Sequence, residues 1–482
     1  MNYTNIEYSY MTKYLLVLLL VLSGTITNSQ SIGEICGTPI PEQQWENTFS
    51  ELINQFRALQ IQSGSNRFTE YTIPVIFHVV HSGQSIGSFP NIQREQINSQ
   101  ITVLNQDFAG TGFNYQTYPA NAFIQWAVNQ SLPPESRDSL GRVKIANINI
   151  KFCLAEKDTN GNILTEPGIE RINLNTRGWS NPNIFTTPAA LRTYFDGTIK
   201  PQSIWNAKKY LNIWISDKNA AMPFTGFSTL PPLSTLPGIS GNGEGTDSTD
   251  GIWSYSSAVG SAFIFPGGIY ASPNVRGRTI THEAGHYLGL RHIWADGNCL
   301  TDYCADTPPA FTSNTGFPVY PLNPGSCNAP SNSPNGEMYM NYMDYSADPA
   351  KYMFTYDQAV RMQTAMLNSP LRNTLGTHGL CVAVLGFNNE GGIIPAHFQL
   401  MQNYPNPFNP VTEISFSIPE QISISLIIYN SIGEQISVLL DEDMKAGYHN
   451  IKWDASSYPS GIYYYRLVSQ KETISRKMVL IK

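Results

Sequence analysis

Three of the eight histidines of this 482-residue chain lie within eleven residues, in the segment HEAGHYLGLRH at 282–292. On a helix, His282 and His286 differ in direction by about 40°, so both imidazoles leave one face and can bind one metal ion. A continuous helix would direct His292, about 240° beyond His286, away from that ion. Gly289 can adopt a positive φ at no steric cost, so we expect the helix to end there and the chain to return His292 to the metal.

Three neutral nitrogen ligands leave the fourth position of a tetrahedral zinc site open, which is typical of catalytic rather than structural zinc. A closed site would need a fourth ligand, and the sequence has no Cys-x-x-Cys pair to supply one. Glu283 is not needed as a ligand. Beside the ligands it can take a proton from water as general base and pass it to a leaving amine. The motif therefore predicts a catalytic zinc site.

The composition argues against one class of partner. Only 13% of the residues are charged, and acidic residues outnumber basic ones by 36 to 29. A nucleic-acid binder normally carries a basic stripe, so we expect no nucleic-acid partner. The length suggests about three folded units.

The first 30 residues have the layout of a signal peptide. An apolar run, Tyr14–Leu22, follows the positive charge of Lys13 and gives way to small and polar residues. The run is too short to span a bilayer, which needs about 20 apolar residues, and no later segment reaches that length. We therefore expect a signal peptide at 1–30, no transmembrane segment, and a secreted protein.

The chain changes character after Cys381. Residues 382–397 have the composition of a linker. Short segments of alternating hydrophobicity follow, such as 414–418 and 422–428, and they predict a small all-β sandwich over 398–482.

The same C-terminal region resembles a known family. Its segments Gln402–Pro410, Trp453-Asp454 and Lys477–Leu480 are similar to the C-terminal sorting domain of the type IX secretion system of Bacteroidetes. The resemblance implies an export signal that is read by the type IX secretion machinery and takes no part in catalysis. A sandwich can also host adhesion. The alternative is therefore a non-catalytic surface protein with a relict zinc site, but such a protein would not need Glu283.

The zinc motif and three segments around it, RHIW at 291–294, DTP at 306–308 and MNYMDY at 340–345, resemble the pappalysin family of metzincin metalloendopeptidases. The resemblance implies an α+β fold: a metzincin-type catalytic domain at 67–381, with a mixed twisted sheet, the zinc-binding helix and an irregular lower subdomain, followed by the sandwich. It implies that protein or peptide chains are the substrates. It also implies that Met343 forms the Met-turn below the zinc and that the Tyr345 hydroxyl stabilises the tetrahedral intermediate. Core packing is the alternative for both residues.

Asp348 is the residue from which we predict the substrate specificity. It falls where pappalysins that prefer Arg, and sometimes Lys, at P1′, the residue after the scissile bond, place an acid at the base of the S1′ pocket. An ordinary turn at 346–349 is the alternative. The chain departs from the family here, because Ala347 stands where a second acid is usual and no cysteine occurs near Ala350-Lys351. One family disulfide is therefore in doubt.

Cys36-Gly37 is similar to a Cys-Gly in the propeptide of bacterial pappalysins. In a propeptide at 31–66, the Cys36 thiolate would fill the open zinc position and keep the enzyme latent. A structural disulfide is the alternative. A preference for Arg at P1′ would place self-cleavage between Asn66 and Arg67.

For the remaining cysteines we expect that Cys327 pairs with Cys299 or Cys304 and that Cys153 pairs with Cys381, which leaves one cysteine unexplained. In the loop that follows the zinc motif, Asp302 and Asp306 are predicted calcium ligands, since family members bind calcium near here; solvated loop acids are the alternative.

Patterning in the catalytic region predicts a few elements. We expect strands at 72–80, 145–154 and 210–216, a helix at 91–108, and a helix after Thr355 in which Gln358 completes a capping box.

Overall fold

The structure is a computed structural model that describes residues 36–63, 67–158, 160–233, 243–327, 334–381, 398–400, 403 and 408–481. The predicted signal peptide and linker, and Asn66, lie outside the described residues. No helix in the described part of the chain is long and apolar enough to cross a membrane.

A mixed sheet organises the larger part of the molecule. Its strands are β1 (Tyr71–His81), β2 (Ile150–Leu154), β3 (Ile169–Asn173), β4 (Leu211–Ser216), β5 (Gly226–Ser228) and β6 (Ile252–Tyr255). The order is β2-β1-β4-β6-β5, and β3 also pairs with β1. Every pairing is parallel except that of β5, which runs antiparallel to β6 and forms the edge of the sheet. The eight consecutive buried residues of β1 are typical of a central parallel strand.

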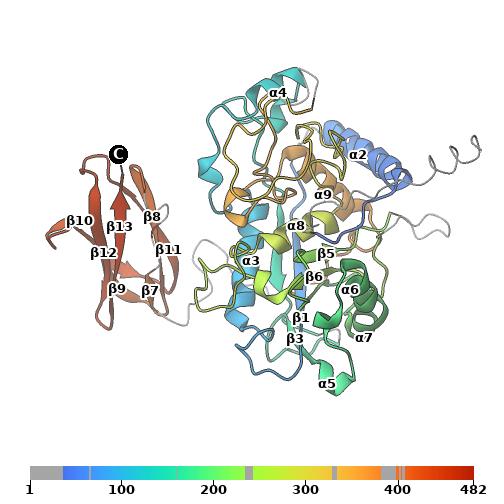
Figure 1. The fold of residues 1–482 in the computed structure, drawn as a ribbon, viewed down its shortest axis with the longest axis horizontal. Helices are drawn as coiled ribbons and strands as arrows, with labels where there is room; N and C mark the ends of the chain where they lie inside the picture. The colour runs from blue at the N-terminus through green and yellow to red at the C-terminus, as the bar shows by residue number, and fades with distance from the viewer. Residues whose placement is uncertain are drawn as a thin grey trace, which may run out of the picture.

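Helices α3 (Arg94–Phe108) and α8 (Arg278–Tyr287) pack against strands of this sheet, and α9 (Tyr356–Asn368) follows later in the chain. In Figure 1, α8 lies beside β5 and β6 with α3 next to it. The predicted capping box of α9 is confirmed, because the Thr355 and Gln358 side chains bond reciprocally to each other's backbone N–H groups. The shorter helices are α4 (Ile124–Asn129), α5 (Leu174–Arg177), α6 (Pro188–Tyr194), α7 (Lys200–Ser203), the π-helix η4 (Phe195–Ile199), and the 3-10 turns η1 (Tyr115–Thr117), η2 (Pro134–Ser136), η3 (Pro182–Ile184), η5 (Ser256–Ala258) and η6 (Asp348–Ala350).

The predicted strand at 145–154 begins only at Ile150. The residues before it bond elsewhere, because the Ala146 N–H donates to Phe354 O and the Ile148 N–H donates to Phe108 O. Between α8 and α9 the described residues form turns and η6, as expected for an irregular lower half.

One helix precedes the sheet and was not predicted. Helix α2 (Gln43–Ser63) packs against α9. Its Glu46 carboxylate pairs with the Arg361 guanidinium at 3.2 Å, and its Arg57 pairs with Asp357 at 2.7 Å. The segment between the predicted signal peptide and the sheet is therefore attached to the larger unit by a helix.

The C-terminal strands form two sheets over their own core, and the predicted β-sandwich is confirmed (Figure 1). The strands are β7 (Gln399–Leu400), β8 (Val411–Ile418), β9 (Ile422–Tyr429), β10 (Gln435–Met444), β11 (Gly447–Asp454), β12 (Gly461–Ser469) and β13 (Thr473–Leu480). One sheet has the order β10-β9-β12-β13, and the other has the order β11-β8-β7.

The cysteines pair as expected. Disulfides join Cys153 to Cys381 and Cys299 to Cys327, so the second option for Cys327 is not used. Cys36 and Cys304 are free and buried.

Candidate active site

The histidine motif lies on α8 and on the turn that ends it. The helix ends at Tyr287, and Gly289 adopts a φ of +94°. The Gly289 N–H donates to His286 O and the Leu290 N–H donates to Gly285 O, both at 2.9 Å, which is a Schellman motif. The predicted break at Gly289 is therefore confirmed, and it sends the chain back toward the helix face that carries the first two histidines.

The three imidazoles meet at one point. Their Nε2 atoms form a triangle with sides of 3.1, 3.2 and 3.3 Å. Tetrahedral zinc with Zn–N bonds of about 2.0–2.1 Å would separate its nitrogen ligands by about 3.3 Å. The residues His282, His286 and His292 therefore fit a Zn²⁺ ion.

The other ring nitrogens explain why Nε2 is available to a metal. His282 Nδ1 donates to Tyr342 O at 2.8 Å and His286 Nδ1 donates to Leu290 O at 2.9 Å, because a carbonyl oxygen can only accept. Burial and the neighbouring imidazoles lower the pKa of His282, and they lower the pKa of His286 to about 3, so both rings stay neutral. His292 Nδ1 lies against Asp296 Oδ1, and this orienting carboxylate was missed. Its position four residues after His292 is the sequence signal that could have identified it.

Glu283 is buried on the same helix, next to the edge strand β5. A Cβ at Gly226 would lie 2.6 Å from Glu283 Oε1, so glycine leaves room for the carboxylate. Burial raises the pKa of Glu283 to about 7. A carboxyl group with such a pKa can both accept and return a proton near neutral pH.

Cys36 lies beside the three histidine Nε2 atoms, where a fourth metal ligand would be. Its Sγ and the three histidine ligand atoms all lie within 4.8 Å of one another. The Thr38 hydroxyl donates to Glu283 Oε2 at 2.9 Å, and the Gly37 N–H donates to Gly226 O at 2.9 Å. The 36–38 segment therefore covers the histidines, the carboxylate and the edge of the sheet together.

Met343 and Tyr345 border the site from the loop before η6. Met343 packs closely under α8, since a Cβ at Gly285 would lie 2.4 Å from its Sδ. The Tyr345 ring lies with its centroid 5.0 Å from that of His292 and 4.6 Å from that of Trp294. Burial, followed by the charges of Cys36 and Asp296, raises the pKa of Tyr345, so its hydroxyl keeps the proton it can donate.

A cavity of about 210 Å³ opens beside His282 and Glu283. Its wall includes the Tyr345–Ala347 segment and Lys351. Asp348 does not belong to the lining. Its side chain is buried, and its Oδ2 accepts hydrogen bonds from the backbone N–H groups of Arg276 and Arg278, at 2.9 and 3.4 Å.

Asp302 and Asp306 are buried rather than solvated, and they lie near Asp357. Oδ1 of Asp302 accepts from Thr307 Oγ1 at 2.6 Å, and Oδ2 of Asp306 accepts from the Asp357 N–H at 2.9 Å. The second oxygen of each carboxylate has no hydrogen-bond partner among the described residues. Burial raises the pKa of Asp302 to about 7 and also raises that of Asp306.

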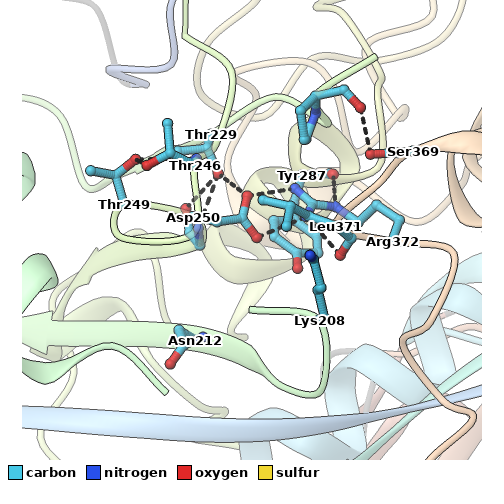
Figure 2. Close-up of polar contacts among 12 residues, drawn as sticks. Lys208, Asn212, Thr229, Thr246, Thr249, Asp250, Tyr287, Ser369, Leu371 and Arg372 are labelled. Atoms are coloured by element: carbon cyan, nitrogen blue, oxygen red, sulfur yellow. Dashed lines mark hydrogen bonds and ion pairs between the residues drawn. The ribbon is translucent and has the colours of Figure 1, made fainter. Parts of the chain in front are cut away.

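A buried ion pair holds the C-terminal end of α8. Figure 2 shows the Asp250 carboxylate directed at the Arg372 guanidinium, with two contacts of 2.8 and 2.9 Å. Arg372 Nε also donates to Tyr287 O at 3.0 Å, and Thr229 Oγ1 donates to Asp250 Oδ1 at 2.9 Å. A cation near the last carbonyls of a helix is favourable. Here the Arg372 guanidinium holds the carbonyl of Tyr287, the residue after His286.

Two family models match the chain. One is described as pregnancy-associated plasma protein-A and matches residues 262–367; the other is the secretion system C-terminal sorting domain and matches 402–482. The extracellular metalloprotease of Arthroderma otae is 25% identical over 350 residues, which are 72% of this chain and 94% of that protein. An extracellular metalloprotease of Colletotrichum graminicola is 25% identical over 354 residues, 73% of this chain and 95% of that protein.

Among solved structures, the chain is 31% identical to mature mirolysin of Tannerella forsythia in complex with a cleaved peptide, with 64% of this chain and 97% of that chain covered and a TM-score of 0.48. It is 30% identical to a promirolysin mutant from the same organism, with 71% of this chain and 97% of that chain covered and a TM-score of 0.49.

Proposed function

This chain belongs to the pappalysin family of secreted metalloendopeptidases, and we propose that His282, His286 and His292 hold its catalytic Zn²⁺. The Nε2 triangle beside a buried carboxylate is the observation that supports the proposal most directly. When bound, Zn²⁺ supplies a Lewis acid that polarises the scissile carbonyl and lowers the pKa of water.

The chain's own residues perform the proton transfers. Glu283 takes a proton from the attacking water and delivers it to the amine that leaves, and a pKa of about 7 suits both steps. The Tyr345 hydroxyl donates a hydrogen bond to the oxyanion. Met343 provides the apolar support under the zinc helix α8, and Asp296 orients His292.

The 31–66 segment acts as a propeptide whose Cys36 thiol keeps the enzyme latent. Cys36 Sγ lies where it can take the open position at the metal, and Thr38 engages the Glu283 carboxylate at the same time. Latency then ends when this segment is cut away. The expected cut before Arg67 depends on a preference for basic residues at P1′.

That preference rests on Asp348, which supports it as a buried carboxylate with one oxygen, Oδ1, that makes no hydrogen bond to the described residues. Lys351 lines the cavity beside Glu283, whereas Asp348 does not.

Asp302 and Asp306 hold a Ca²⁺ ion in this proposal. The two carboxylates are buried and each has an oxygen without a hydrogen bond in the described structure, and such hard oxygen donors suit calcium.

The chain divides by function into a signal peptide (1–30), the propeptide (31–66), the catalytic domain (67–381), a linker (382–397) and the sorting domain (398–482). The protein is secreted and carries a type IX sorting tail. We propose that the secretion machinery reads this tail, while protein or peptide chains bind at the catalytic domain.

The test compares the wild type with Glu283→Ala and with Glu95→Ala, a control at an exposed position on α3. All three full chains are matured with the same added protease, which is then inhibited, and their turnover of a peptide library is measured. Turnover should vanish in Glu283→Ala and persist in Glu95→Ala. Equal turnover by wild type and Glu283→Ala would overturn the proposal.

A further inference from the structure

The 36–38 segment lies along the edge strand β5. This strand pairs with β6 on one side, and on its other side Cys36 forms a parallel bridge with Gly226. The Gly37 N–H donates to Gly226 O at 2.9 Å, and the Ser228 N–H donates to Thr38 Oγ1 at 2.8 Å. Once the segment is cut away, these backbone groups of β5 are available to another extended chain, as at other sheet edges that bind peptides.

Glu283 determines which chain comes next to this edge. Its Oε1 would lie 2.6 Å from a Cβ at Gly226, so the carboxylate is directly beside the strand. In the proposed function Glu283 moves protons at the scissile bond, and the inference below rests on that function. The substrate backbone must therefore lie beside Glu283, and so beside β5.

Arg192 reaches this edge from helix α6. Its Nη1 donates to Gly37 O at 3.1 Å, and its Cζ lies 5.5 Å from the centroid of the Phe227 ring on β5. Gly37 itself packs closely here, since a Cβ at this position would lie 3.3 Å from Phe227 Cβ and 3.4 Å from the Phe224 ring. In the latent enzyme the guanidinium therefore binds the backbone carbonyl of a chain that is packed against the edge strand.

The Arg192 guanidinium has partners that do not depend on the 36–38 segment. Helix α6 continues into the π-helix η4, which places Asp196 one turn after Arg192, with 3.3 Å between Arg192 Nε and Asp196 Oδ2. Lys200 Nζ pairs with Asp196 Oδ1 at 2.8 Å. Two cations thus share one carboxylate, and the guanidinium stays oriented toward the strand when Gly37 leaves.

We infer that Arg192 is a substrate-binding residue, and that it binds a backbone carbonyl of the substrate in place of Gly37 O after maturation. A hydrogen bond from an ionised donor is stronger than a neutral one. Every residue of a peptide chain carries a carbonyl, so this contact aligns the substrate along β5 whatever its side chains are. Arg192 therefore contributes to affinity rather than to side-chain specificity.

The test compares matured full chains of the wild type, Arg192→Met and Arg177→Met. Arg177 is an exposed arginine on α5 and serves as the matched control. The substrate is a peptide with several uncharged residues on each side of the cut, and it is shortened one residue at a time from either end.

Arg192→Met should lower kcat/KM for the longest peptide at least about tenfold, mainly by raising KM, because it removes a hydrogen bond made with a charged group. One truncation should abolish this deficit, since the peptide then lacks the carbonyl that Arg192 binds. Arg177→Met should match the wild type on every peptide, and Arg192→Lys should keep part of the affinity. Asp196 retains Lys200 as its partner in these variants, so no carboxylate is left without a cation.

The long and short peptides are compared on one preparation of each variant, so a lower fraction of folded enzyme cancels. The inference is overturned if Arg192→Met shows no deficit, if its deficit is the same for every truncated peptide, or if the deficit lies in kcat alone. Cleavage of the longest peptide by Glu283→Ala at the wild-type rate would instead overturn the proposed function.

Discussion

Replacing Arg372 by methionine should destabilise the catalytic domain strongly. The guanidinium makes two contacts with Asp250 and one with the Tyr287 carbonyl at the end of α8. The two side chains of the ion pair are 0% and 1% exposed. Arg372→Met would leave the Asp250 carboxylate in the interior with neutral donors such as the Thr229 hydroxyl and without the cation that balances its charge.

The size of the effect follows from the burial of this charge. Removing one partner of a buried ion pair costs about 3–5 kcal/mol, because the other charge stays behind without compensation. Asp250→Asn keeps the shape of that side chain and removes its charge. The double variant Arg372→Met/Asp250→Asn should therefore recover about half of the loss or more, which is a large coupling between neighbouring sites.

The measurement is urea unfolding of the full chain in a Glu283→Ala background, which prevents self-digestion. Lys151→Met is the control, because Lys151 pairs with Glu70 and the two side chains are 56% and 57% exposed, and a surface pair is worth about 0–1 kcal/mol. The reasoning fails if Arg372→Met costs no more than Lys151→Met, or if Asp250→Asn restores nothing in the double variant.

Four further results are expected. Cys36→Ala should raise peptide turnover by the uncleaved chain at least about tenfold, because a thiolate no longer fills the metal position; an unchanged rate would count against the switch. Tyr345→Phe should lower kcat about 10²-fold with little change in KM, as for the loss of one oxyanion donor. Burial raises the pKa of Asp344 from 3.8 to about 7, so the folded state binds a proton that the unfolded chain releases. The contribution of Asp344 to stability should therefore fall by up to about 4 kcal/mol as the pH rises from about 4 to about 7. Asp344→Asn should make the pH dependence of unfolding shallower by that amount, while buried carboxyls such as Glu283 and Asp302 keep their own share of it. Finally, Ca²⁺ should raise the unfolding midpoint of the wild type but not that of Asp306→Asn, and an equal rise in both would exclude this site.

The features that the sequence predicted correctly are those with a local cause. The helix break needs only Gly289 after the last turn, and the start of α9 needs only Thr355 and Gln358 three residues apart. Strand β1 is a continuous apolar run, which predicts a central strand without any partner in view.

Strand β10 and helix α2 were not predicted, because neither has a local pattern in the sequence that indicates it. No residue of β10 is buried and its pairing with β9 contains register shifts, so it lacks the alternation that predicts a strand. The contacts that hold α2, such as Glu46 with Arg361, join residues about 300 positions apart and leave no local pattern.

The sequence by itself determined the chemistry of this protein: which side chains can hold zinc, which carboxylate can move a proton, and which tail directs export. The spacing of these residues within one turn of helix or one strand dictates their geometry. The tertiary structure alone decided what surrounds them. It placed the Thr38 hydroxyl on the Glu283 carboxylate and set Lys351 rather than Asp348 in the wall of the cavity. Burial and long-range packing decide these neighbours, and neither is encoded in the spacing of a motif.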